Sequence, residues 1–187
     1  MKDDAGLRYS IGSDDIIDWV SEGWTRFAAQ NDAPALSADA VIGKPIWQFI
    51  SDIETREIYR LLLTRVRFAR VPIDFEFRCD APTAKRFMRM VITPDQQRLV
   101  LTTELVRLEP TVENPLLRRT NRLSHDLVKV CSWCKKLWIG DDQWEEAEIA
   151  LDILGPFGRD AMPIVSHGMC EPCKTSFLEK LRSTDNR

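Results

Sequence analysis

Four cysteines in the C-terminal part of the sequence could together bind a metal ion. They form two CxxC pairs, Cys131-Ser-Trp-Cys134 and Cys170-Glu-Pro-Cys173, separated by 35 residues. Each pair can fold into a tight turn that directs two thiolates to one point, and two such turns supply the four sulfur ligands of a closed tetrahedral zinc site. The spacing therefore predicts a structural Zn²⁺ ion bound by Cys131, Cys134, Cys170 and Cys173.

Two other interpretations of these cysteines stay open at this point, and a third is disfavoured. His167 lies three residues before Cys170 and could replace one thiolate, because imidazole is a good zinc ligand. The thiols could form a redox switch in which oxidation ejects the metal. A catalytic zinc ion is disfavoured, because it needs an open coordination position and four sulfurs leave none.

The segment that carries the cysteines is too short to be stable by apolar burial alone. A module of about seventy residues buries a small fraction of its surface, whereas a structural zinc ion contributes roughly 10–16 kcal/mol of apparent binding free energy near neutral pH. We therefore expect metal binding and folding of this segment to be linked.

A local run of residues around the cysteines resembles a known bacterial family. The run comprises Cys131-Ser-Trp-Cys134-Lys-Lys, then Trp144 followed by acidic residues, then Ser166-His-Gly-Met-Cys-Glu-Pro-Cys173. It is similar to the cysteine-rich tail attached to many PAS-type sensory and signalling proteins. The stretch Leu154–Gly158 is longer than the usual connection, and Glu-Pro stands where Pro-Glu is common, but neither difference removes a ligand. The resemblance implies a zinc-bound appendage on a sensor.

Composition is that of a soluble globular protein. The chain has 187 residues, of which 44% are hydrophobic and 29% charged. There are 15 basic and 18 acidic residues before Arg118, and 11 of each from Arg118 onward. This balance gives no strong reason to expect nucleic acid as the main partner, because phosphate binding draws on Lys and Arg. No apolar run is long enough to cross a membrane and no export signal is visible, so we expect a cytoplasmic protein.

The N-terminal part of the sequence predicts a hairpin followed by helices. Two strands are expected on either side of Gly12-Ser-Asp-Asp15, and Ser21 is expected to cap a helix over residues 22–30. The longest helix is expected over residues 54–69. Four of its side chains are expected to share one buried face, namely Ile58, Leu61, Leu62 and Val66.

Three strands are predicted to follow, at residues 73–80, 86–93 and 98–107. Alternation along the first of them places Cys79 on the same side as Phe75 and Phe77, so Cys79 is expected in the core. Two strands, a group of helices and a three-stranded meander make an α+β fold with helices on one face of an antiparallel sheet.

This order of elements is similar to that of a PAS domain, and we assign residues 7–109 to a PAS-like sensory domain. The resemblance implies a sensor that holds a small molecule or pairs with another copy. The sequence does not identify a ligand for this domain, because both histidines, His125 and His167, lie outside it.

Residues 110–130 are interpreted as a linker and a connecting helix, because Pro110 and Pro115 interrupt regular structure and apolar residues recur at helical spacing from Leu116 to Val130. Residues 131–187 are assigned to the four-cysteine zinc module. Within it we expect a strand pair around Gly140-Asp-Asp and helices at 145–154 and 174–181.

The sequence shows no catalytic constellation. We therefore expect a non-enzymatic cytoplasmic signalling sensor or adaptor, in which the PAS-like domain is coupled to a structural zinc module that binds a protein partner. A homodimer and a nucleic-acid partner stay open. The alternatives are a zinc-dependent regulator of transcription that contacts DNA and a thiol-based redox switch.

Overall fold

The computed structural model describes residues 6–50, 52–117, 123–154 and 162–183. The chain divides into two compact units. The first lies within Met1–Ser51, Arg56–Glu76 and Met88–Leu105, and the second within Asp52–Thr55, Phe77–Phe87 and Val106–Arg187. No helix in the described part of the chain has both the length and the apolar character needed to cross a membrane.

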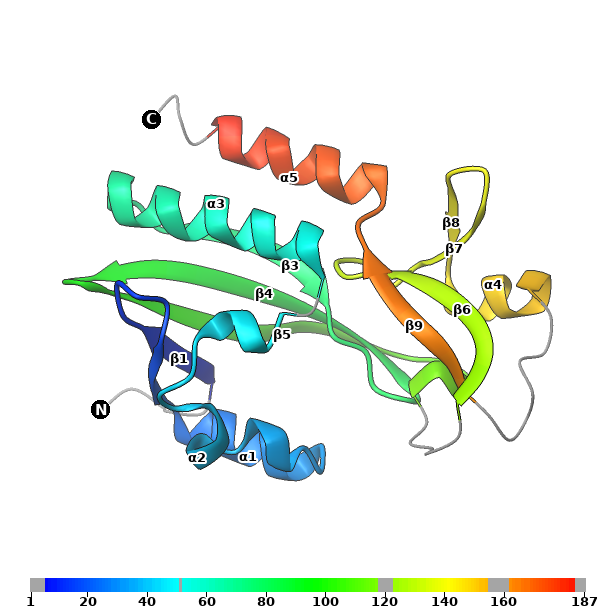
Figure 1. Cartoon of the computed structure of the whole chain (residues 1–187), viewed down its shortest axis with the longest axis horizontal. Coiled ribbons are helices and arrows are strands. Elements are labelled where there is room, and N and C mark those ends of the chain that lie inside the picture. The colour runs from blue at the N-terminus through cyan, green and yellow to red at the C-terminus, as the bar shows by residue number, and fades with distance from the viewer. Residues whose placement is uncertain (1–5, 51, 118–122, 155–161, 184–187) are drawn as a thin grey trace. The chain divides into compact units, whose positions relative to one another are not determined.

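The first unit is built on an antiparallel sheet whose strand order is β2-β1-β5-β4-β3 (Figure 1). Its strand bounds are β1 Leu7–Ile11, β2 Ile17–Val20, β3 Ile73–Arg78, β4 Ala84–Asp95 and β5 Arg98–Pro110. β1 pairs antiparallel with both β2 and β5. The expected N-terminal hairpin and the succession of three neighbouring strands are confirmed, and the fold class is the expected α+β class.

The helices of the first unit begin where the sequence supplies caps and turns. They are α1 Glu22–Gln30, η1 Pro34–Leu36, α2 Ala38–Val41, η2 Ile46–Gln48 and, from Arg56 onward, α3 Ile53–Ala69. Ser21 Oγ accepts a hydrogen bond from the backbone N–H of Trp24, as expected for an N-cap. Tyr9 of β1 packs edge-to-face on Trp24 at a centroid distance of 5.2 Å, which joins α1 to the sheet.

The core of the first unit lies between α3 and the sheet. Leu62 and Val66 are completely buried, and Tyr59 packs edge-to-face on Phe75 of β3. The prediction of which α3 side chains are buried is wrong at one position. Leu61 is 52% exposed, and Leu63 is buried in its place. Both leucines fit an apolar stripe in the sequence, and only the direction of the neighbouring strands decides between them.

The end of β3 departs from simple alternation. Ile73 and Phe75 are buried as expected, but Cys79 is only half-buried, so its assignment to the core is wrong. Arg78 is 6% exposed instead. Polar partners compensate for the burial of this guanidinium, which pairs with Asp80 and with Glu146.

The second unit contains a mixed sheet with the strand order β8-β7-β6-β9. Its elements, besides the ends of β3, β4 and β5, are η3 Pro115–Leu117, β6 Leu123–Cys131, β7 Leu137–Gly140, β8 Gln143–Glu145, α4 Ala147–Leu154, β9 Met162–Gly168 and α5 Glu171–Ser183. The expected strand pair and both expected helices are present. A small core beneath α4 is formed by Val128, Leu137, Ala147 and Ala150.

The prediction of a connecting helix before the first cysteine is wrong. Pro115–Leu117 forms one 3₁₀ turn, and Leu123–Cys131 is strand β6, while the residues between them lie outside the described part. β6 pairs in parallel with β9, a strand that was not predicted from the sequence. Val128 and Val130 suit a strand because their branched side chains pack well on a pleated surface.

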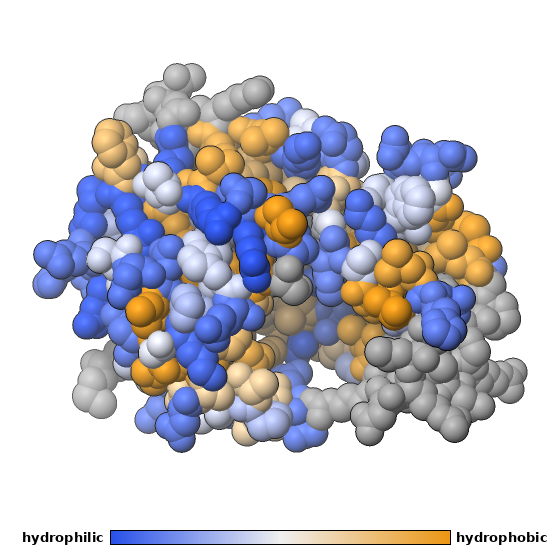
Figure 2. Space-filling view, viewed as in Figure 1, coloured by the Kyte–Doolittle hydropathy of each residue, from blue (hydrophilic) through white to orange (hydrophobic). Residues whose placement is uncertain are grey.

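On the face drawn in Figure 2, apolar side chains are interspersed with hydrophilic ones. Exposed apolar residues of the second unit include Leu127 on β6 and Ile164 on β9, which are paired in the sheet.

Candidate metal centre

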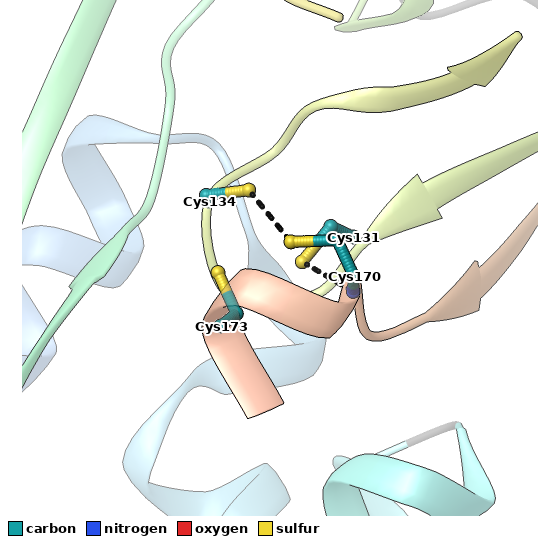
Figure 3. Close-up of side chains that lie close together, drawn as sticks. All are labelled: Cys131, Cys134, Cys170 and Cys173. Atoms are coloured by element: carbon teal, nitrogen blue, oxygen red, sulfur yellow. Dashed lines mark hydrogen bonds between the residues drawn. The ribbon is translucent and has the colours of Figure 1, made fainter. Parts of the chain in front are cut away.

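The four predicted ligands come together at one end of the second sheet. The Sγ atoms of Cys131, Cys134, Cys170 and Cys173 all lie within 4.8 Å of one another. Figure 3 shows the four side chains gathered around a common point, and none of them is in a disulfide. Each pair of cysteines alone would make a two-sulfur site, so the convergence of both pairs is the property that a four-sulfur site requires.

Parallel pairing of β6 and β9 explains this convergence. Cys131 is the last residue of β6, and it is in register with Gly168 at the end of β9. Because the carboxyl ends of parallel neighbours lie at the same edge of a sheet, the turns that follow the two strands start side by side. The backbone N–H of Ser132 donates to the carbonyl of Gly168 at 2.8 Å and fixes the two turns together.

The first CxxC pair lies in a tight turn. Lys135 N–H donates to the carbonyl of Cys131 at 3.0 Å, and Cys131 N–H donates to the carbonyl of Lys136 at 2.8 Å. Lys135 adopts a positive φ of 62°, the left-handed conformation that reverses the chain. This reversal brings Lys136 back beside Cys131 and closes the turn that contains both cysteines.

The second CxxC pair lies at the start of α5. Cys170 directly precedes the helix, and its carbonyl accepts the first helical hydrogen bond from Lys174 N–H at 3.1 Å. Cys173 follows within the first turn. The positive end of the helix dipole favours thiolates at both positions.

Hydrogen bonds among the sulfurs show that the cluster is too crowded for four independent thiols. Hydrogen bonds from Cys134 and Cys173 hold the pKa of Cys131 far below its usual value. The bond to Cys131 raises the pKa of Cys134 to about 12, and the bonds to Cys131 and Cys134 raise the pKa of Cys173. A divalent cation could take the place of the protons that these sulfurs share, because thiols bind metal as thiolates.

The geometry fits a tetrahedral sulfur-ligated metal ion. With metal–sulfur bonds of about 2.3 Å, the sulfurs of a tetrahedron lie about 3.8 Å apart. Cys134 Sγ and Cys170 Sγ are 3.7 Å apart, and the largest separation in the cluster is no more than 4.8 Å. Small side-chain rotations would bring all four sulfurs to bonding distance. With all four positions taken, such an ion would have no site for water or substrate.

His167 is not part of the cluster. Its strand position is in register with Val130, and its side chain is exposed. Among the described residues, the group that could hold a metal ion consists of the four cysteines. Desolvation and the charge of Lys135 lower the pKa of His167, which favours the neutral imidazole.

The turns beside the cysteines are held by residues that the sequence analysis did not single out. Trp133, inside the first pair, packs edge-to-face on Phe177 of α5 at 5.6 Å, and its carbonyl accepts a hydrogen bond from Arg78 N–H at 2.8 Å. Glu146 accepts from Arg78 and from Lys85. Arg78 had no signal in the sequence, because alternation along the strand places it on the same side as the charged residues Asp74 and Glu76.

Comparisons with known proteins give neither a family model nor a curated protein that matches this chain. Solved structures that are similar to it include PAS domains. The PAS domain of Bordetella pertussis BvgS is 19% identical over 55% of this chain and 73% of that chain, with a TM-score of 0.38. The PAS domain of the Cronobacter turicensis quorum-sensing receptor RpfR, solved in complex with BDSF, is 12% identical over 55% and 95%, with a TM-score of 0.38.

The photoactive yellow protein domain of the sensor histidine kinase Ppr from Rhodospirillum centenum is 12% identical over 54% of this chain and 84% of that chain, with a TM-score of 0.37. Likeness at this level does not carry a ligand or an activity from those proteins to this one. The order of elements in the first unit is nevertheless the PAS-like order expected from the sequence. The second unit holds four clustered cysteines that could bind a metal ion.

Proposed function

We propose that the four cysteines bind one structural Zn²⁺ ion and that the chain is a non-enzymatic signalling sensor or adaptor of the cytoplasm. The convergence of the four sulfurs within 4.8 Å carries the metal assignment. Zinc is favoured over other ions because four thiolates in a closed tetrahedral shell are its preferred structural environment.

The sensor role is supported by the architecture of the first unit. Its order of strands and helices is the PAS-like one, and sensing by ligand binding or pairing is what that resemblance implies. The signal would be received in this unit, whereas the second unit would be the output. A protein is the partner we propose for the output.

The exposed apolar residues of the second sheet support a protein partner. Leu127 is 68% exposed and Ile164 is 46% exposed, and they are paired across β6 and β9. A contiguous exposed apolar patch marks a surface that binds other proteins, and we propose that these two side chains lie at its centre. A second copy of the chain is one candidate for this partner.

Native mass spectrometry of the full chain tests the proposal in one measurement. We expect a mass increase equal to one zinc ion per chain, and denaturation should release that ion. The same spectra would show the number of chains in the assembly and any retained small molecule. A protein purified with zinc in all buffers that carries no metal, or that carries a stoichiometry other than one per chain, would contradict the proposed centre.

A separate comparison tests the output role. The Leu127→Glu and Ile164→Glu variants should keep one zinc ion per chain, because neither residue is a ligand, but should lose the self-association or partner binding that the wild type shows. Val71→Glu is the matched control, because Val71 is an exposed apolar residue of the first unit. Equal association by the wild type and both apolar-surface variants would remove this surface from the proposal.

A further inference from the structure

Two carboxylates at the start of α3 contact the two cysteine turns. Asp52 Oδ2 accepts a hydrogen bond from Ser132 Oγ at 2.7 Å, inside the first CxxC pair. Glu54 Oε2 accepts one from the backbone N–H of Met169 at 2.7 Å, directly before Cys170. Asp52 and Glu54 belong to the same compact unit as the cysteines, although they are far from them in sequence.

Asp52 serves both the helix and the cysteine turn. Its Oδ1 accepts a hydrogen bond from the backbone N–H of Thr55 at 2.7 Å, which caps the first turn of α3. Its Oδ2 is the acceptor for Ser132. One carboxylate therefore holds the helix start and the turn between Cys131 and Cys134 at the same time, and neither can move without disturbing the other.

Glu54 acts on the second turn through consecutive amides. Met169 N–H donates to Glu54, and the next amide, that of Cys170, donates to Cys131 Sγ at 3.4 Å. The carboxylate thereby orients the peptide that brings Cys170 to Cys131.

We propose that Asp52 and Glu54 are positioning residues for the metal centre, so that metal binding and the first turn of α3 are energetically coupled. The inference rests on the proposed zinc site and adds a regulatory link to it. Coupling of this kind is reciprocal. If an intact helix start raises the affinity for metal, bound metal must stabilise the helix start by the same factor. A ligand that disturbs the start of α3 would then change metal affinity.

The test is a zinc competition titration of the full chain against a chromophoric chelator. Ser132→Ala removes the hydrogen bond to Asp52 without touching the helix cap, and Glu54→Ala removes the acceptor for Met169. Each should weaken zinc binding by about tenfold, the scale expected when an outer hydrogen-bonding partner of a metal site is lost. Glu54→Gln keeps an oxygen acceptor and should restore affinity to within about threefold of wild type.

Glu57→Ala is the matched control on the same helix. The Glu57 side chain is 58% exposed and pairs only with the exposed Arg60 among the ion pairs of the described residues. Its removal should leave zinc affinity unchanged. Cobalt(II) supplies a spectroscopic readout, because the absorption of a tetrahedral thiolate site reports ligand geometry. Its bands should shift in Ser132→Ala and Glu54→Ala but not in Glu57→Ala.

The reciprocal effect is measured by hydrogen exchange. Removing zinc from the wild type should accelerate exchange of the Thr55 amide, whereas amides around Leu62 in the first unit should stay protected. Unchanged exchange at Thr55 after complete metal removal would overturn the coupling.

Failure of this inference is distinguishable from failure of the proposed zinc site. A wild-type chain that binds no zinc would contradict both the zinc site and the coupling. A wild type that binds one zinc ion, together with Ser132→Ala and Glu54→Ala variants of unchanged affinity, removes only the coupling. Should Glu54→Ala not fold, the pair Ser132→Ala and Glu54→Gln still decides the matter, because tenfold weakening in the first and near wild-type affinity in the second are both required.

Discussion

The two compact units are stabilised by different chemistry. Most of the large, completely buried side chains belong to the first unit, among them Ile11, Leu62, Ile92, Leu99 and Leu101. In the second unit the apolar cluster is small and includes two alanines, and two of its buried residues are cysteines of the proposed metal centre. Burial of apolar surface can stabilise the first unit, whereas the second needs a further source of stability.

This difference shows what the metal would contribute. A bound ion links four chain positions at once and replaces the apolar contacts that a short segment cannot make. Ion pairs add to this in the second unit, where Arg78 and Asp80 are both nearly buried. Loss of metal should therefore destabilise mainly the second unit, and loss of core volume should destabilise mainly the first.

The largest effect is expected from removing a ligand. Cys170→Ser should weaken zinc binding by more than about a hundredfold, beyond the usual cost of losing an outer partner, and should unfold the second unit. Zinc content and hydrogen exchange measure this. Cys79→Ser is the matched control, because Cys79 is half-buried but is not in the cluster. If both variants keep one tightly bound zinc ion, the metal does not stabilise the second unit as argued.

A substitution in the core of the first unit should destabilise that unit and leave zinc binding intact. Leu62→Ala should lower the free energy of unfolding of the first unit by about 4 kcal/mol, because a completely buried leucine leaves a cavity. Zinc stoichiometry should stay at one. Leu61→Ala, at a position that is 52% exposed, should change stability by less than about 0.5 kcal/mol. Denaturant unfolding followed by tryptophan fluorescence distinguishes these outcomes, and equal effects of the two variants would argue against the packing of α3.

A somewhat smaller effect is expected at the buried ion pair. Arg78→Met should destabilise the second unit by about 3 kcal/mol, because Asp80, whose side chain is 8% exposed, would keep a buried charge without its partner. Arg89→Met is the control. The ion pair of Arg89 with Asp74 is 48% exposed on each side and should contribute less than about 1 kcal/mol. Thermal unfolding of zinc-loaded protein provides the measurement, and the two losses should not be equal.

The smallest effect is a pH dependence at His167. Its pKa is lowered in the folded protein, so below the ordinary value of 6.5 the unfolded chain binds more protons and stability falls as pH falls. Because the side chain is exposed, the loss between pH 7.5 and 6.0 should be below about 0.5 kcal/mol relative to His167→Gln. Unfolding midpoints with excess zinc measure it. A wild type that gains stability over the variant as pH falls would contradict this sign.

Sequence analysis succeeded where the signal was local. The cap at Ser21, the hairpin beside Gly12 and the long helix α3 all depend on residues a few positions apart. It failed at β6, whose apolar residues fit a helical stripe as well as a strand over so short a range. Pairing with β9 decides between the two, and β9 is more than thirty residues further along the chain.

The amino-acid sequence alone predicts which four cysteines form a cluster, because the spacing within each CxxC pair is a property of a single tight turn. Only the tertiary structure decided that the two turns share one edge of a sheet, and that Asp52, Glu54 and Arg78 contact them. The reason is how far apart along the chain the interacting residues lie. Caps and turns are fixed by neighbours along the chain, whereas parallel pairing and burial of a charge depend on partners that only the folded chain brings together.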